Sequence, residues 1–146
     1  MSILSIATSG LSAASLRVNV AASNIANVRT TGPLPASDGS TSAGAASSSA
    51  SFPAAYVPLQ VNQVDQSSGS TPGGTSANVS TVSPSYTAQS DPTAPFANQE
   101  GLVAAPNVDL ANEFVQLATA KYSYIANAKV IRAYSETEKT LLDIMT

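Results

Sequence analysis

Apolar residues recur every seven positions through the first 28 residues. One row holds Leu4, Leu11, Val18 and Ile25, and a second row, three positions later, holds Ala7, Ala14, Ala21 and Val28. Spacings of three and four over about four heptads are typical of a helix that pairs with another long helix. Ser2 can cap the start of this helix, and the stretch 27–33 can end it. The pattern predicts a helix within residues 1–29.

Two partners are open to this apolar stripe. It can pack on the core of its own domain, which is the usual place of an amphipathic helix. It can also pair with another long helix, in the same chain or in a neighbouring one. We favour pairing, because Leu, Ile, Val and Phe make up only 31 of the 146 residues and leave little material for a core.

The middle of the chain has a different composition from its two ends. In residues 30–51, 20 of 22 positions are Ala, Ser, Gly, Thr or Pro, which is typical of a flexible low-complexity loop. Alternation at Val57, Leu59 and Val61, and a second β-prone run over 79–82, flank a cluster of Gly and Pro. Residues 52–106 are therefore expected to form a small β-rich middle domain with a hairpin. Pro58 would place its first strand at an edge.

The last forty residues return to a helical pattern. Asn107 or Asp109 can cap the start, and no Gly or Pro follows up to the last residue. The apolar stripe is formed by Leu110, Phe114, Leu117, Tyr124, Ala128 and Ile131, with a flanking row of Ala111, Val115, Ala118, Tyr122 and Ile125. Such a wide apolar face can hold two partners at once. The pattern predicts a helix over 107–146 inside a layered assembly.

Together these segments predict a mostly α fold. Long N- and C-terminal helices pair as a coiled coil, and a small β-prone middle domain and a low-complexity loop lie between them. The expected division is an N-terminal helix in 1–29, the loop in 30–51, the middle domain in 52–106 and a C-terminal helix in 107–146.

Composition excludes most kinds of chemistry. The chain has no Cys and no His, so disulfides, thiolate metal sites and the commonest general base are absent. None of the standard motifs for phosphate, zinc or calcium occurs, and Ser has neither a His nor a Ser-x-x-Lys partner. We therefore expect no enzyme, no cofactor, no metal and no small-molecule substrate.

Charge argues against two further classes of partner. Only 10% of residues are charged and the net charge is −3, which disfavours nucleic acid. No charge precedes Arg17, so the basic start of a cleaved secretory signal is missing. No uninterrupted run of 18 apolar residues exists, which predicts no direct membrane insertion.

Two sets of residues carry a resemblance to a known family. Residues 9–14 (SGLSAA), 19–27 (NVAASNIAN) and 30–32 (TTG) resemble the N-terminal signature of bacterial flagellar rod and hook proteins. Residues 100–103 (EGLV), 106–110 (PNVDL) and 124–131 (YIANAKVI) are similar to the matching C-terminal signature. The short chain resembles the proximal rod members most. It departs from the family at Pro33, where an aromatic residue is usual, and in the Ala/Ser-rich stretch 36–51.

The resemblance implies a structural subunit of the flagellar basal-body rod, the periplasm-spanning shaft that transmits torque. It implies export through the flagellar type III apparatus without a cleaved signal peptide. It also implies other rod proteins and copies of the chain as partners, together with basal-body ring proteins and adaptors at the export gate. The terminal helices would polymerise into the inner tube of the rod.

The residues expected at the assembly interface lie on both helical stripes and at three Asn residues. They are Leu4, Leu11, Val18, Asn24, Ile25, Asn27, Leu110, Phe114, Leu117, Tyr124, Ile125, Asn127 and Ile131. Because a free subunit has few ways to bury these stripes, we expect its ends to fold on assembly.

A second hypothesis is a soluble helical-hairpin binding module, such as a flagellar export chaperone or adaptor. It would fold as a stable compact dimer on its own. A third possibility, a helix lying on a membrane surface, is disfavoured because residues 1–16 hold no Lys or Arg to meet anionic lipid.

Overall fold

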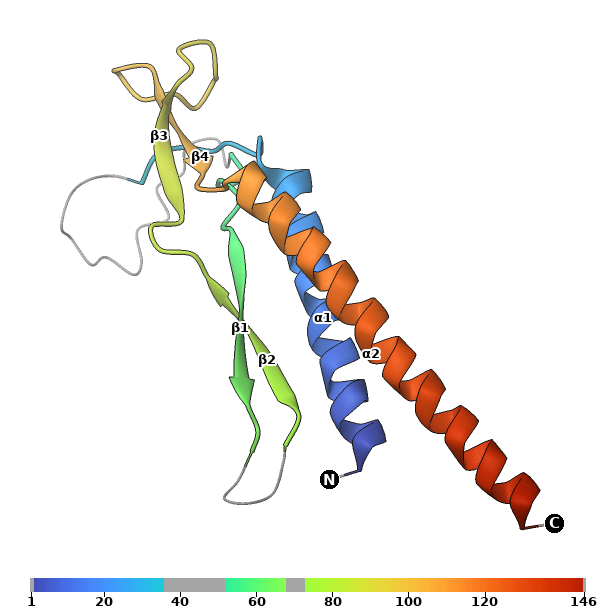
Figure 1. Cartoon of the computed structure of the whole chain (residues 1–146). Helices are drawn as coiled ribbons and strands as arrows, with labels where there is room; N and C mark the ends of the chain where they lie inside the picture. Colours follow the sequence, from blue (N-terminus) through green and yellow to red (C-terminus); the bar gives the residue numbers. More distant parts are fainter. Residues whose placement is uncertain (1, 36–51, 68–72, 146) are drawn as a thin grey trace. The chain divides into compact units, whose positions relative to one another are not determined.

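The structure is a computed structural model that describes residues 2–35, 52–67 and 73–145 (Figure 1). Two long helices lie at the two ends of the chain and four short strands between them. In chain order the elements are α1 (Ile3–Asn27), β1 (Leu59–Asp65), β2 (Thr75–Thr81), β3 (Tyr86–Ser90), β4 (Leu102–Pro106) and α2 (Leu110–Ile144). The expected mostly helical architecture is confirmed. Most of the low-complexity loop expected over 30–51 lies outside the described residues.

Contacts divide the chain into two compact units. The helical unit combines Met1–Ile25, Leu59–Ser80 and Asp109–Thr146, and the strand unit combines Ala26–Pro58 and Thr81–Val108. The hairpin of β1 and β2 thus belongs with the helices, although it lies within the stretch 52–106 that the sequence assigns to one middle domain. The four-part division along the sequence stays a prediction.

Side chains at the predicted caps start both helices. The Ser2 hydroxyl oxygen accepts a hydrogen bond from the Ser5 N–H at 3.2 Å. Asp109 caps α2, since one of its carboxylate oxygens accepts from the backbone N–H groups of Ala111 and Asn112 at 2.9 and 3.3 Å. These bonds satisfy amide groups that have no partner inside the helix. Of the two caps considered from sequence, Asp109 is the one used.

The hairpin of β1 and β2 is the first of two small sheets (Figure 1). The side chains of Gln60 and Asn62 both donate to the Ser80 hydroxyl, at 3.3 and 2.8 Å. At the end of β1, the Ser67 hydroxyl and N–H donate to the Asp65 carboxylate, and these bonds lower the pKa of Asp65. Alternating apolar residues predicted both strands, but β1 begins only after Pro58.

The strand unit is built on the antiparallel pair β3 and β4. Tyr86 lies opposite Pro106 and Ser90 opposite Leu102. Gly32 extends this sheet through two backbone hydrogen bonds with Ala104, at 3.0 and 2.9 Å. A Cβ at Gly32 would collide with the backbone of Ala55, so this close approach needs Gly. Val103 and Ala104 are fully buried here and form the centre of the unit.

The length and composition of α1 require one correction to the sequence analysis. Within the described residues, α1 is long and apolar enough to cross a membrane by those two criteria alone. The rule of 18 uninterrupted apolar residues missed it, because Ser and Asn interrupt the run while the average hydropathy stays high. The core helix of a soluble protein passes the same test, and the contacts of α1 described below are those of a core helix.

Candidate assembly interface

Asn24 joins three elements of the helical unit. Its side-chain oxygen accepts from the Leu59 N–H of β1 at 3.0 Å, and its amide group donates to the Leu59 carbonyl at 2.8 Å. The same amide donates to the Glu113 carboxylate of α2 at 2.7 Å. Asn24 is fully buried, and a buried amide of this kind is stable only while its hydrogen bonds are made. The residue therefore fixes α1, β1 and α2 relative to one another.

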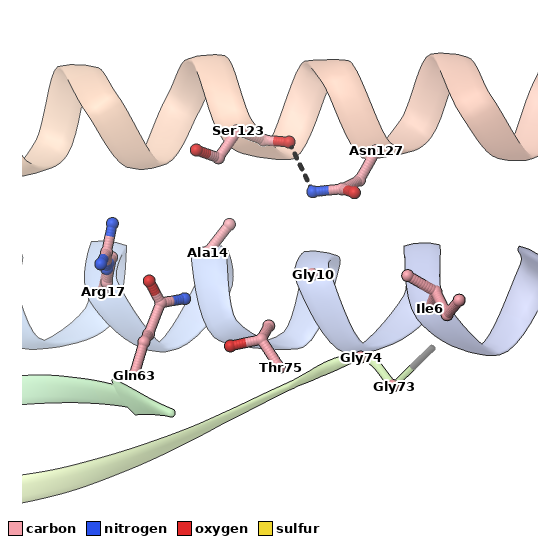
Figure 2. A pocket seen from close by; sticks show the side chains of 10 residues that line it. All are labelled: Ile6, Gly10, Ala14, Arg17, Gln63, Gly73, Gly74, Thr75, Ser123 and Asn127. Atoms are coloured by element: carbon pink, nitrogen blue, oxygen red, sulfur yellow. Dashed lines mark hydrogen bonds between the residues drawn. The ribbon is translucent and has the colours of Figure 1, made fainter. Parts of the chain in front are cut away.

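A second close contact between the helices lies at Gly10. A Cβ at this position would lie 2.6 Å from the Asn127 side-chain nitrogen, so Gly10 makes room for the Asn127 amide. That amide donates to the Ser123 carbonyl of its own helix at 2.9 Å. Figure 2 shows Asn127 pointing from α2 toward Gly10 on α1. The absence of a side chain at Gly10 lets the two helices approach closely.

These two contacts define the register of the pair. Gly10 meets Asn127 and Asn24 meets Glu113, so as the residue number rises in α1 it falls by the same amount in α2. The helices are antiparallel, and the start of α1 at Ile3 lies level with residue 134. The last ten residues of α2, 135–144, therefore extend beyond α1. At 1.5 Å per residue this extension is about 15 Å long.

The hairpin is attached to α1 at Ser9. The Thr75 N–H donates to the Ser9 hydroxyl oxygen at 3.1 Å, and that hydroxyl donates to the Ile6 carbonyl at 2.7 Å. Gly74 approaches Ser9 so closely that any Cβ there would collide with it. The seam of the helical unit thus uses small and polar residues from α1, α2 and the hairpin.

Small residues of α1 are buried inside the subunit, whereas its large apolar residues are not. Ala7, Ala14 and Ala21 of the second heptad row are at most 3% exposed. The first row is more open: Leu4 is exposed, and Leu11, Val18 and Ile25 are half-buried. The large side chains of α1 therefore keep much of their apolar surface available for another molecule.

The same division is stronger in α2. Ala120 is its only buried residue within the described part of the chain. Phe114 is 60% exposed, and Leu110, Tyr124 and Ile125 are also exposed. Leu117, Asn127 and Ile131 are half-buried on the side that faces α1. Exposed apolar surface on this scale is typical of a surface that another protein covers.

Most of the predicted interface residues thus keep surface free for a neighbour. Of the thirteen, Asn24 alone is buried in the chain itself, and Asn27 is half-buried at the end of α1. Whether the thirteen contact a neighbouring subunit stays a prediction. The positioning residues Ser9, Gly10 and Glu113 were not among them. A Gly inside a helical pattern was the available signal for Gly10, since it costs stability unless close packing requires it.

A pocket of about 290 Å³ lies within the helical unit (Figure 2). It is lined from α1 by Ile6, Gly10, Ala14 and Arg17, from the hairpin by Gln63, Gly73, Gly74 and Thr75, and from α2 by Ser123 and Asn127. This volume is just below the roughly 300–1,000 Å³ of typical small-molecule sites. It is large enough for one or two protein side chains.

Two polar pairs lie on the outer part of α2. Arg132 and Glu136 form an exposed ion pair at 2.9 Å. The Tyr134 hydroxyl bonds to Glu138, and the pKa of Tyr134 is raised by this hydrogen bond and by the negative charge. Exposed pairs one helical turn apart stabilise a helix only slightly. Within the described residues, no three Asp or Glu side chains gather in a way that could hold a metal ion.

Comparisons with known proteins point to one family. The model described as "Flagella basal body rod protein" matches residues 4–33, and the "Flagellar basal body rod FlgEFG protein C-terminal" model matches residues 99–144. The flagellar basal-body rod protein FlgC of Salmonella typhimurium is 37% identical over 135 residues, which cover 90% of this chain and 87% of that protein. FlgC of Escherichia coli O157:H7 is 36% identical over the same shares.

Proposed function

This chain belongs to the family of flagellar basal-body rod proteins and is a structural subunit of the rod, and we propose that it is built into the rod through its two terminal helices. The two matched segments contain almost all of α1 and α2. We further propose that the helices pair as a coiled coil and that copies of the chain and other rod proteins cover their outer faces.

The exposed apolar surface of the two helices is the observation that supports this proposal best. Within each subunit, small residues such as Ala14 and Ala120 fill the seam, and large residues such as Phe114 stay exposed. Burying those large side chains between subunits would remove apolar surface from water, which is the dominant favourable term in protein association. A subunit with this surface gains stability from assembly.

Further partners and the location are proposed on the same basis. We place the chain in the periplasmic part of the rod, next to basal-body ring proteins and to adaptors at the export gate. We propose export by the flagellar type III apparatus without a cleaved signal peptide and no insertion of α1 into the membrane. The buried Asn24 and Ala rows support the last point, because they pack on protein. We propose no catalysis for the chain.

A charge placed on the outer faces tests the proposal. Leu11→Asp on α1 and Ile125→Asp on α2 should each abolish incorporation into the rod and hence motility, because a neighbour would have to bury an unpaired carboxylate. The measurement is motility, together with the number of copies in isolated hook–basal bodies, in cells that make only the variant chain.

Matched controls carry the same new charge on exposed polar positions. Ser15→Asp on α1 and Gln116→Asp on α2 should leave motility close to that of the parent chain. Normal motility with both Leu11→Asp and Ile125→Asp would rule out assembly through these faces.

A further inference from the structure

We propose that the pocket beside Arg17, which we name the Arg17 pocket, binds the Asp143 carboxylate at the C-terminal end of α2 from a second copy of this chain. The inference rests on the proposed function, since it requires copies of the chain to lie next to one another. It goes beyond that function by assigning a specific polar contact between copies.

Arg17 is the first observation that carries the proposal. It is the only charged residue of α1, it is half-buried, and it lines the pocket with its side chain directed toward α2 (Figure 2). Throughout the described ranges, no carboxylate forms an ion pair with it. A guanidinium group withdrawn from water is stabilised by a carboxylate, which it can bind with two parallel hydrogen bonds.

The rest of the pocket suits a carboxylate on a short side chain. Gln63, Ser123 and Thr75 bring an amide and two hydroxyl groups that can donate hydrogen bonds. Ile6 and Ala14 bring apolar surface for the carbon atoms beside such a carboxylate. The described lining includes no acidic residue that would repel it. The volume of about 290 Å³ fits a side chain better than a cofactor.

The end of α2 is the matching ligand. Its last ten residues extend beyond α1, and Leu141, Leu142, Ile144 and Met145 are each more than half exposed. The last turn of α2 contains no basic residue, although Asp143 lies there. A carboxylate at the negative end of a helix dipole is unfavourable, and an Arg of another molecule would remove that penalty. The exposed apolar residues around Asp143 would be buried by the same contact.

The carboxylate has to come from another copy. The register of the helix pair places Arg17 level with Ala120 of its own α2, and Asp143 lies 23 residues further along that helix. This separation is about 35 Å along the axis, which no side chain can span. A contact between the end of one copy and the side of the next is heterologous. Such contacts build open helical filaments, as a rod requires.

Disulfide trapping tests the contact in the assembled particle. The chain has no Cys, so copies carrying Arg17→Cys and copies carrying Asp143→Cys can be made together in one cell and oxidised mildly in isolated hook–basal bodies. We expect a disulfide-linked dimer of the two differently tagged copies. The control replaces Asp143→Cys by Ala133→Cys, an exposed position ten residues earlier on α2, and should give no dimer.

A charge exchange gives a second, independent measurement. Arg17→Glu should lower the number of copies per hook–basal body by about tenfold, and adding Asp143→Arg should restore most of it. The proposal is overturned if the double variant is no better than Arg17→Glu. It is also overturned if both Cys copies are incorporated and no dimer forms, or if the trapped partner is another rod protein. Presence of the parent chain in the same particles separates these outcomes from a failure of the proposed function.

Discussion

Asn24 shows how a single residue can determine the geometry of the helical unit. It is one of the few polar groups in the buried seam, and its three printed hydrogen bonds reach a strand and a second helix. An apolar residue at this position would pack against almost any neighbour, whereas an amide tolerates few arrangements. The sequence identified Asn24 as a residue of interest, but it contains no signal that names Leu59 and Glu113 as its partners.

Removing the amide tests that role. Asn24→Ala should leave the Leu59 N–H and carbonyl without their side-chain partner and should cost about 1–3 kcal/mol for each buried group that stays unpaired. The number of copies in isolated hook–basal bodies, relative to the amount of chain in the cell, should fall. Asn19→Ala, at an exposed position on the same helix, should change little. Equal incorporation of the two variants would show that the Asn24 contacts are dispensable.

At the scale of elements, α1 separates small from large residues between its two heptad rows. The heptad pattern predicted both rows correctly as apolar, but it could not tell which row faces the chain's own second helix. The structure resolves this: the Ala row is buried and the Leu row is open. Size decides the outcome, because Gly10 and the Ala row let α2 approach α1 closely. The larger side chains would hold the helices apart.

The close approach predicts a paired effect at Gly10. Gly10→Ala improves the intrinsic helix propensity by about 1 kcal/mol, yet its methyl group would overlap the Asn127 amide, and overpacking typically costs about 1–3 kcal/mol. We expect Gly10→Ala to reduce incorporation and Asn127→Ala to restore it when both changes are present. The measurement is again the copy number per hook–basal body.

The control for Gly10→Ala is Ser15→Ala, an exposed change in the same helix. If Gly10→Ala were incorporated as well as Ser15→Ala, the two helices would not approach each other as closely as the structure shows.

At the scale of the whole molecule, the two ends were more predictable than the middle. Strong periodicity, the cap at Asp109 and the absence of Gly and Pro after it made α2 readable from the sequence. The pair β3 and β4 was not foreseen as separate strands, because all five residues of β3 are exposed and have no alternating pattern. Their pairing depends on Val103 and Ala104 being buried within the strand unit, which only the folded chain brings about.

The exposed surface of the helices predicts the behaviour of the isolated subunit. Because α2 buries only Ala120 among its described residues, we expect the ends of the free chain to be largely disordered and to gain helix on assembly. Circular dichroism of the purified chain should show far less helix than the 60 residues of α1 and α2, without a cooperative thermal transition. A stable helical dimer that unfolds cooperatively would favour a chaperone or adaptor instead.

The most direct test of the rod assignment is quantitative mass spectrometry of hook–basal bodies isolated from cells that make this protein, after removal of membrane and filament. The account predicts peptides of this chain in a small, fixed number of copies per particle. Recovery of the chain only from the cytosol or from the export-gate fraction, with none in the particles, would contradict it.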